Sequence, residues 1–516
     1  MKTVPQTHSP APTCPLEIEL KLALPPAQQS AFLALMARRR SQPVKRKLIT
    51  RYFDTPDCAL SSRGFALRLR KSGRRWVQTL KTEGTRQGGL SHRIEYEMAV
   101  LGGNLDWSRF PEMAQDWVPE SVRAQLLPVF ETQFTRTAWQ LRGAGGARIE
   151  VALDVGEVRT GTRCQPICEI ELELQAGNPD ALFALAQGWA LKLDCLPLDA
   201  SKAERGMRLA LRQPDRPVRF VPPSLNPDIP VEQAFVAIAL ACLTQFQANL
   251  PGLLTGRDRE FLHQSRVALR RLRVALRLFR KRCDPPDALL DDLRALDAAL
   301  GPARDWDVLC DETLPAIEPH FGDEREWQAG RKMLEEKRAA AHAAMRDTVG
   351  ELRPGAWLLA FNRWLWQFGR PAQAIHSPLS DPQSTRPRLK AWARRKLKRN
   401  HQRLIRDAPE KMSGPPARQH ALRVEIKRQR YAMDFFRSLF DRAEQKSYLS
   451  ALQALQAGLG ELNDARMGAR RVAESLGEGD AMRHFVLEWL AARERGDAQR
   501  EMAKQLRKFI KTPPCW

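Results

Sequence analysis

The sequence predicts a multidomain α+β chain, with strands in its N-terminal part and only helices in its C-terminal part. Before residue 213, short segments alternate apolar and charged residues and are separated by glycine-containing turns. After residue 231, long Ala/Leu/Arg-rich segments follow a helical period. Between them, "QPDRPVRFVPPSLNPDIP" (213–230) is rich in proline, which blocks both helix and central strand. We therefore expect a proline-rich linker at 213–230.

The composition predicts a globular protein with an anionic partner. The 516 residues carry a formal net charge of +23, with a pI of about 10.1. Nucleic acid, a membrane surface or a polyphosphate-like solute would each suit this charge. Nine dispersed cysteines without a CxxC motif favour a reducing compartment. With no signal-peptide pattern and no apolar run of about 18 residues, we expect a cytoplasmic protein without a membrane partner.

The N-terminal strands carry charge on one face. In "EIELK" (17–21), Glu17, Glu19 and Lys21 share a face, while Ile18 and Leu20 share the other. The same alternation recurs in at least five predicted strands, and both signs of charge are present. Two structures satisfy this pattern: an open sheet with its charges in solvent, or a closed barrel whose charges line a bore that can hold a small ligand.

Motifs in order along the chain resemble the CYTH family. They are "EIELK", "YFDTPD" (52–57), "ALRLR" (66–70), "TLK" (79–81), "HRIEYE" (92–97), "ALD" (152–154), "EIELEL" (169–174) and "SKAERG" (201–206). This family includes triphosphate tunnel metalloenzymes, thiamine triphosphatases and class IV-type adenylate cyclases. The resemblance covers residues 14–212 and implies an eight-stranded antiparallel tunnel, in which basic side chains hold a triphosphate and carboxylates hold a divalent metal.

The resemblance also implies roles for individual residues, because phosphate requires cations and Mg²⁺ or Mn²⁺ prefers carboxylate oxygens. The metal ligands are expected to be Glu17, Glu19, Glu169 and Glu171. Substrate-binding cations are expected at Lys21, Arg51, Arg68, Arg70, Arg136 and Lys202. Catalysis is assigned to Lys81, Arg93, Glu95, Glu97 and Asp154.

The expected reaction is metal-dependent hydrolysis of a terminal phosphoanhydride bond. Inorganic triphosphate is the default substrate because it needs only the charges of the tunnel. Thiamine triphosphate would need an aromatic clamp, for which Trp76, Trp107 and Trp139 are available. No residue pattern specifies adenine, so adenylate cyclase activity stays an alternative.

The C-terminal part has a basic stripe that occurs twice. In 261–281, side chains at steps of three and four fall on one helical face, and 420–437 repeats the pattern at an offset of 157 residues. "LGPARDWDV" (300–308) is echoed by "LGELNDARM" (459–467) at an offset of 159. The stripe residues are His263, Arg266, Arg270, Arg273, Arg277 and Arg280 in the first copy, and His420, Arg423, Lys427, Arg430 and Arg437 in the second, where Asp434 interrupts the pattern.

This duplicated pattern resembles the CHAD family over residues 231–510. The resemblance implies repeats at about 231–368 and 388–510, around a basic channel that binds inorganic polyphosphate. Asp305 and Asp464 are expected to orient arginines by ion pairing. The segment 369–387 is expected to separate the repeats.

The sequence therefore predicts a triphosphatase joined to a polyphosphate-binding domain, located in the cytoplasm or at polyphosphate granules. The first alternative is a non-catalytic polyphosphate-binding protein with a degenerate tunnel. Nucleic-acid binding is a further alternative, although the stripe lacks the aromatic residues that stack on bases.

Overall fold

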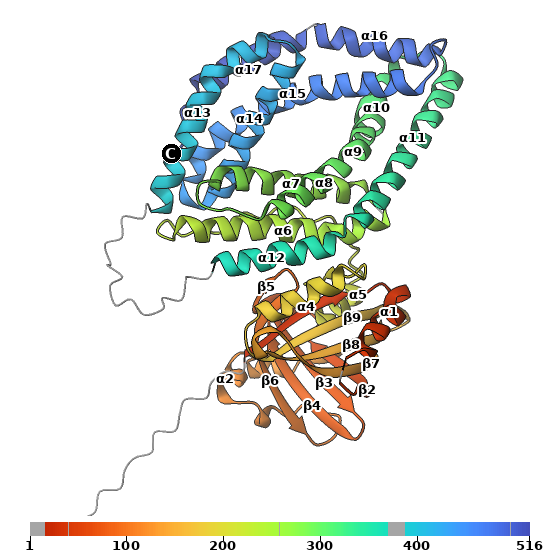
Figure 1. The fold of residues 1–516 in the computed structure, drawn as a ribbon, viewed down its shortest axis with the longest axis vertical. Coiled ribbons are helices and arrows are strands. Elements are labelled where there is room, and N and C mark those ends of the chain that lie inside the picture. Colours follow the sequence, from red (N-terminus) through yellow and green to blue (C-terminus); the bar gives the residue numbers. More distant parts are fainter. Residues whose placement is uncertain (1–15, 40, 257, 370–387, 496) are drawn as a thin grey trace, which may run out of the picture. The chain divides into compact units, whose positions relative to one another are not determined.

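The computed structural model describes residues 16–39, 41–256, 258–369, 388–495 and 497–516. The predicted break at 369–387 lies almost entirely outside these residues. The chain forms two compact units, one extending to Asp215 with the short segment Gly355–Arg363, the other containing the remaining residues. As expected, strands dominate the first unit and helices the second (Figure 1).

The first unit contains a closed antiparallel barrel, which confirms the predicted fold. Around the barrel the strands follow the order β1-β9-β8-β7-β2-β3-β4-β6, and pairing of β1 with β6 closes the ring of eight. The bounds are β1 Leu16–Ala23, β2 Val44–Asp54, β3 Phe65–Ser72, β4 Arg75–Thr82, β6 Leu90–Val100, β7 Leu127–Arg142, β8 Arg148–Thr160 and β9 Arg163–Ala176. The short strand β5 (Thr85–Gln87) pairs with β6, and the short strand β10 (Leu196–Pro197) pairs with β1.

The apolar face of the barrel points outward and is covered by short helices. These are α1 (Gln29–Ala37), α2 (Glu112–Asp116), α3 (Glu120–Arg123) and α4 (Asp180–Ala190). Leu67, Leu80 and Tyr96 pack against residues of α2, and Phe32 of α1 packs edge-on against Trp139. Because the apolar side chains form this outer core, the alternating charged side chains are left for the interior.

One end of the barrel is filled by α5 (Lys202–Ala210). Ala203 and Met207 of α5 pack against a cluster that includes Phe130 and Phe134. The helix begins with a capping box, in which the Ser201 side chain accepts a hydrogen bond from the Glu204 N–H and Glu204 accepts one from the Ser201 N–H. This cap fixes Lys202 in the first turn, from which its buried side chain reaches the carboxylates inside the barrel.

The second unit is all-helical, also as predicted. Its elements are α6 Val231–Thr255, α7 Arg259–Phe279, α8 Asp287–Ala299, α9 Gly301–Val308, α10 Leu314–Ile317, α11 Glu324–Glu351, α13 Leu389–Ser413, α14 Pro416–Phe435, α15 Arg442–Ser475, α16 Ala481–Arg495 and α17 Asp497–Lys511, while α12 (Pro354–Gly369) contributes residues to both units. The proline-rich residues 213–230 form neither helix nor strand. They are held on the helical unit by hydrogen bonds from the Val218 N–H to Asn249 and from the Leu225 N–H to Ser438.

The helix α6 is apolar enough to resemble a membrane span. Its most apolar window has a mean hydropathy of 1.4, but 61% of that window is buried inside the unit. It is the only such helix among the described residues. A buried core helix passes the same test of length and composition, so α6 is weak evidence for a membrane.

Candidate functional site

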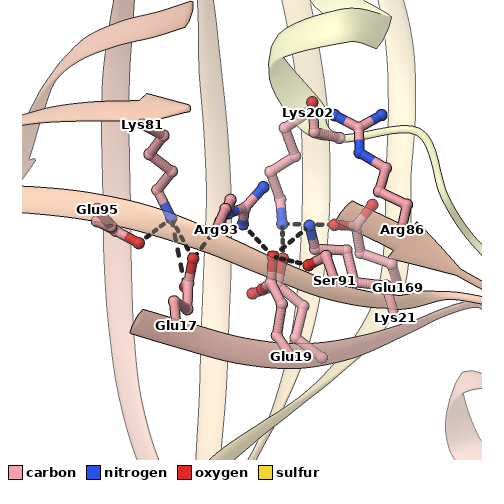
Figure 2. Close-up of polar contacts among 12 residues, drawn as sticks. Glu17, Glu19, Lys21, Lys81, Arg86, Ser91, Arg93, Glu95, Glu169 and Lys202 are labelled. Carbon is pink, nitrogen blue, oxygen red and sulfur yellow. Dashed lines mark hydrogen bonds and ion pairs between the residues drawn. The ribbon is translucent and has the colours of Figure 1, made fainter. Parts of the chain in front are cut away.

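Strand register brings the charged side chains together inside the barrel. Glu17 lies directly across from Arg93, and Lys81 lies across from Glu95. On the other side, Arg136, Asp154 and Glu169 form a row across β7, β8 and β9. Most of these side chains are buried, and Figure 2 shows those from β1, β4, β6, β9 and α5 pointing toward one another. The charged face of "EIELK" therefore points into the barrel.

Lys81 and Arg93 form a network with the carboxylates of Glu17 and Glu95. Lys81 Nζ lies 3.1 Å from Glu17 Oε2 and also contacts Glu95, and Arg93 Nε donates to Glu17 at 2.8 Å. Burial would raise the pKa of Glu95, but Lys81 and Arg68 outweigh burial and lower it to about 2. Burial and the neighbouring arginines lower the pKa of Lys81 to about 8. At neutral pH Lys81 and Glu95 are thus both ionised.

Glu19 is the centre of a second network. Lys21 Nζ lies 2.7 Å from Glu19 Oε1, and Arg93 and Ser91 also contact this oxygen. Although burial would raise the pKa of Glu19, Lys21 and Arg93 lower it overall. Arg93 therefore links the two carboxylates of the opening motif.

Asp154, Glu169 and Glu171 form a buried acidic cluster. One carboxylate oxygen of each lies within 4.8 Å of the other two. Lys202 Nζ sits among them, 2.6 Å from Asp154, 2.5 Å from Glu169 and 2.9 Å from Glu171. Arg136 donates two hydrogen bonds to Asp154, at 2.8 and 2.7 Å, and contacts Glu171. These cations outweigh burial and hold the pKa of Glu171 well below its usual range.

This cluster fits a divalent cation. Its donors are all carboxylate oxygens, which hard cations such as Mg²⁺ prefer. Glu169 and Glu171 were predicted as metal ligands, and Asp154, predicted for catalysis, lies with them. Glu17 and Glu19 are instead paired with Lys81, Arg93 and Lys21. In this arrangement the Lys202 ammonium occupies the place where a cation would be held.

Arg68 and Arg70 lie in the bore next to the first network. Arg68 Nη2 is 3.2 Å from Glu95 and 3.9 Å from Glu97, whose side chain is 52% exposed. Arg70 donates to the Thr50 hydroxyl at 3.4 Å and has no ion pair with a described carboxylate. Burial, together with Arg68 and Arg136, lowers the pKa of Arg70 to about 10, so it stays charged at neutral pH. It is a cation that an incoming anion can pair with.

The structure places Arg51 outside the bore, which corrects its prediction as a substrate-binding residue. Thr50 and Tyr52 point inward, so Arg51 between them points outward and pairs with Glu131 at 3.4 Å. None of the three tryptophans available for a thiamine clamp lines the bore. Trp139 belongs to the outer core, Trp107 packs against Phe110 on that side, and Trp76 lies on the opposite face of β4 from Lys81.

Sequence reasoning missed Arg205 and Ser91 in the bore, and it placed Glu173 on a charged strand face without giving it a role. Arg205, one helical turn after Lys202, is 2.8 Å from Glu169, and the i, i+3 spacing could have identified it. Ser91 of β6 also lies in the bore, where it donates to Glu19. Because it is uncharged, the charge pattern did not include it. Glu173, on the same strand face as Glu171, has its pKa raised to about 7 by burial and by Glu17, Glu150 and Glu19.

In the helical unit, the two basic stripes approach each other. Arg270 of α7 lies near Arg423 and Lys427 of α14, close enough to lower their pKa values. For Lys427, burial is the largest cause, and with Arg270, Arg423 and Arg430 it lowers the pKa to about 6. The buried Nε atoms of Arg266, Arg423 and Arg430 have no hydrogen-bond acceptor among the described residues. These donors without acceptors, and the concentration of cations around Lys427, favour an anion.

The two stripes are related by repeated ion pairs. Arg266 lies 3.7 Å from Asp305, and its counterpart Arg423 lies 3.5 Å from Asp464, which confirms the predicted pairing. In the second copy, His420 Nδ1 is 3.1 Å from Asn463, the residue that replaces Arg304. Asp434, which interrupts the second stripe, pairs with Arg271 at 3.0 Å.

The remaining predicted residues are spread along the same helices. Arg304 and Arg270 are near His263 and, with burial as the largest cause, lower its pKa. Arg273 pairs with Asp297. Arg277 lies near Arg428 on a different face of α14 from the second stripe.

Comparison with known families agrees with both architectures. The CYTH domain model matches residues 15–207, and the CHAD domain model matches residues 237–473. The chain is a CYTH–CHAD protein. Its CYTH domain contains the charged bore and its CHAD domain the two basic stripes.

Individual relatives match each domain separately. An inorganic triphosphatase from Haemophilus influenzae is 34% identical over 207 residues, which are 38% of this chain and 56% of the relative. The chain thus spans just over half the length of that relative. The CHAD domain from the plant Ricinus communis is 29% identical with a TM-score of 0.50, covering 58% of this chain and 99% of that one. A Hippeastrum protein with a dominant triphosphatase activity matches 37% of this chain and 95% of its own, at 21% identity and a TM-score of 0.30.

Proposed function

We propose that the CYTH domain hydrolyses inorganic triphosphate with a divalent metal, Mg²⁺ or Mn²⁺, and that the CHAD domain binds inorganic polyphosphate. The observation that carries the first part is the bore itself. A buried cluster of three carboxylates and a set of buried cations share one enclosed space. Similarity to a protein named as an inorganic triphosphatase supports the same reaction.

The charge balance of the bore supports a role for a metal. The carboxylates already neutralise Lys21, Lys81, Arg93, Arg136 and Lys202. A triphosphate brings several negative charges into a buried site, where uncompensated charge is costly. Asp154, Glu169 and Glu171 would hold the metal, which when bound supplies positive charge for the phosphoryl oxygens and the attacking water.

The chain's own residues would bind and orient the substrate. Arg70 lacks a carboxylate partner, and the buried Nε of Arg68 lacks an acceptor among the described residues. Both can therefore donate to phosphoryl oxygens, and the arginine fork suits such oxygens. Hydrolysis adds one water and releases diphosphate and orthophosphate, and nearby cations offset the charge that develops on the leaving diphosphate.

The substrate is expected to be inorganic. The tryptophans that could have clamped a thiamine ring pack on the outside of the barrel. The bore thus offers cations and hydrogen-bond donors. The oxygens of inorganic triphosphate can pair with these groups without any organic part of the substrate.

Phosphate release by the purified full chain tests the first part. We expect turnover of triphosphate with Mg²⁺ or Mn²⁺ and none in EDTA, and slower turnover of thiamine triphosphate and ATP. Glu171→Gln should reduce turnover by about a hundredfold or more. Glu157→Gln, which changes an outward carboxylate on β8 that contacts Arg159, is the control. An inert wild type, or an active Glu171→Gln, would contradict the proposal.

Polyphosphate binding by the CHAD domain is supported by the facing stripes. An anionic chain lying between α7 and α14 would supply acceptors for Arg266, Arg423 and Arg430 and relieve the repulsion around Lys427. The double variant Arg270→Gln/Arg423→Gln should weaken binding of long polyphosphate at least tenfold and reduce its salt dependence. Arg418→Gln, an exposed change on α14, is the control. If RNA competes better than polyphosphate at equal phosphate concentration, the partner is a nucleic acid instead.

A further inference from the structure

A second basic feature of the helical unit lies at the C-terminal end of the first stripe, away from the place where Arg270 faces Arg423 and Lys427. It is a pocket of about 250 Å³ formed where the end of α7 meets α13 and α14. Seven of its lining residues are cations: Arg277, Arg280 and Lys281 at the end of α7, Lys396, Arg399 and Arg403 on α13, and Arg428 on α14.

The pocket and the second stripe occupy different faces of α14. A helix turns by about 100° per residue, so Arg428 lies about 140° around the helix from Arg423. Glu425, Gln429 and Ala432, the other α14 residues of the pocket, lie on the same side as Arg428. Of the predicted stripe residues, only Arg277 and Arg280, at the C-terminal end of the first stripe, line this pocket. An anion in the pocket is therefore not held by Arg423, Lys427 or Arg430.

The charge of the pocket is uncompensated. None of its seven cations forms an ion pair with a carboxylate in the described part of the chain. Its one acidic residue, Glu425, pairs with Lys411 at 2.7 Å. Burial, with Arg399, Lys281 and Arg280, lowers the pKa of Lys396. Five of the seven cations are exposed and partly screened by solvent, but Lys396 and Arg428 are half-buried, and an anion in the pocket would pair with both groups at once.

The size and lining of the pocket define the ligand. Its volume is smaller than the range of roughly 300–1,000 Å³ of drug-sized ligand sites. The apolar lining consists of aliphatic side chains such as Val274 and Leu404, so no aromatic ring can stack on a base. Arginine and lysine around a small space suit a compact oxyanion with several charged oxygens.

We propose that this pocket between α7, α13 and α14 binds a short inorganic phosphate, of the size of diphosphate or triphosphate, separately from the place where Arg270 faces Arg423 and Lys427. Such an anion pairs with cations of all three helices at once. The site would let the helical unit respond to the short phosphates that triphosphate hydrolysis consumes and produces.

Lysine acylation of the full chain, read by peptide mass spectrometry, tests this site directly. The reaction is run in EDTA, with diphosphate, triphosphate or long polyphosphate at equal phosphate concentration, and with NaCl to match the ionic strength. We expect diphosphate and triphosphate to protect Lys396 and Lys281. Lys390 and Lys398, exposed on α13 but outside the pocket, are the internal controls.

Paired variants make the result specific. Arg399→Gln/Arg403→Gln should raise the triphosphate concentration that half-protects Lys396 by about tenfold. Arg394→Gln/Arg395→Gln, the same loss of charge elsewhere on α13, should leave it unchanged. Equal protection of Lys390 and Lys398, or protection of Lys396 by long polyphosphate alone, would overturn the proposal. Because Glu171→Gln should keep this protection while losing hydrolysis, failure of the tunnel and failure of the pocket give different results.

Discussion

Replacing Lys202 by methionine should make the barrel depend on a divalent metal for stability. The Lys202 ammonium contacts three carboxylates, and the side chains of Asp154 and Glu169 are 0% and 1% exposed. Removing one partner of a buried ion pair costs about 3–5 kcal/mol, because the other charge is left uncompensated. For a domain of 150–250 residues each kcal/mol lowers Tm by roughly 2–4 °C. Lys202→Met should thus lower the Tm of the barrel by roughly 6–20 °C in EDTA.

A divalent cation should reverse much of this loss, because it can occupy the position of the ammonium. At a metal concentration a hundredfold above Kd, binding adds about 2.7 kcal/mol, which corresponds to roughly 5–11 °C. Wild type should gain less, since the metal must first displace Lys202. Scanning calorimetry of the full chain in EDTA and in MgCl₂ or MnCl₂ measures both effects, with the exposed Lys192→Met as control. A variant that melts like wild type in EDTA and is not stabilised by metal would refute the reasoning.

Three further predictions concern the bore, the helix α5 that fills one end of the barrel, and the basic stripes. Arg70→Gln should reduce kcat/KM for triphosphate by about tenfold or more, whereas Arg51→Gln, on the outer face, should change neither kcat nor KM; a loss in both would place Arg51 in the bore after all. Gly206→Ala should destabilise the barrel by about 1–3 kcal/mol, because its new Cβ would lie 2.0 Å from Phe130, and Gly188→Ala, with no atom within 4 Å, is the matched control in thermal melts. Since the pKa of free Lys427 is about 6 and a bound phosphate raises it, polyphosphate binding should take up a proton above pH 6 and weaken as pH rises. Calorimetry in buffers of different ionisation enthalpy measures this uptake, and Lys427→Arg should abolish it.

Strand alternation was enough to group the charged residues of the bore, but not to decide which face was inside. Glu17, Glu19 and Lys21 had to share a face in any extended strand. Whether that face pointed inward depended on the closing pair of β1 with β6 and on the short helices that cover the apolar face. Both are long-range features, so the motif resemblance, not the alternation, predicted the barrel.

The wrong prediction for Arg51 shows that a charged residue of a barrel strand need not point into the bore. On β2 the inward residues are Thr50 and Tyr52, which are neutral, while the charged Arg51 points outward. On this strand the charged residue is not the one that points inward. Only the pairing of β2 with β3 and β7 determines which of its residues face the bore. The grouping of Asp154 with Glu169 likewise follows from the register of β8 and β9, which no single strand reveals.

The helical unit was easier to predict because its repeat is internal to the chain. An offset of 157 residues between stripes, and 159 between the following motifs, required Arg266–Asp305 and Arg423–Asp464 to be equivalent pairs. The pocket at α13 was not predicted, because its cations come from three helices and no one stripe contains them.

The two units deal with positive charge in different ways, and this difference supports their different proposed roles. In the bore, Lys202, Arg136 and Arg93 are each held by carboxylates. Under the proposed function, Arg70 would therefore meet only part of the charge of a triphosphate, and a metal would supply the rest. Along the stripes and in the α13 pocket, Lys427 and Lys396 are surrounded by other cations, so a phosphate itself restores the balance. Hydrolysis in the bore should therefore stop in EDTA, whereas phosphate binding by the helical unit should persist.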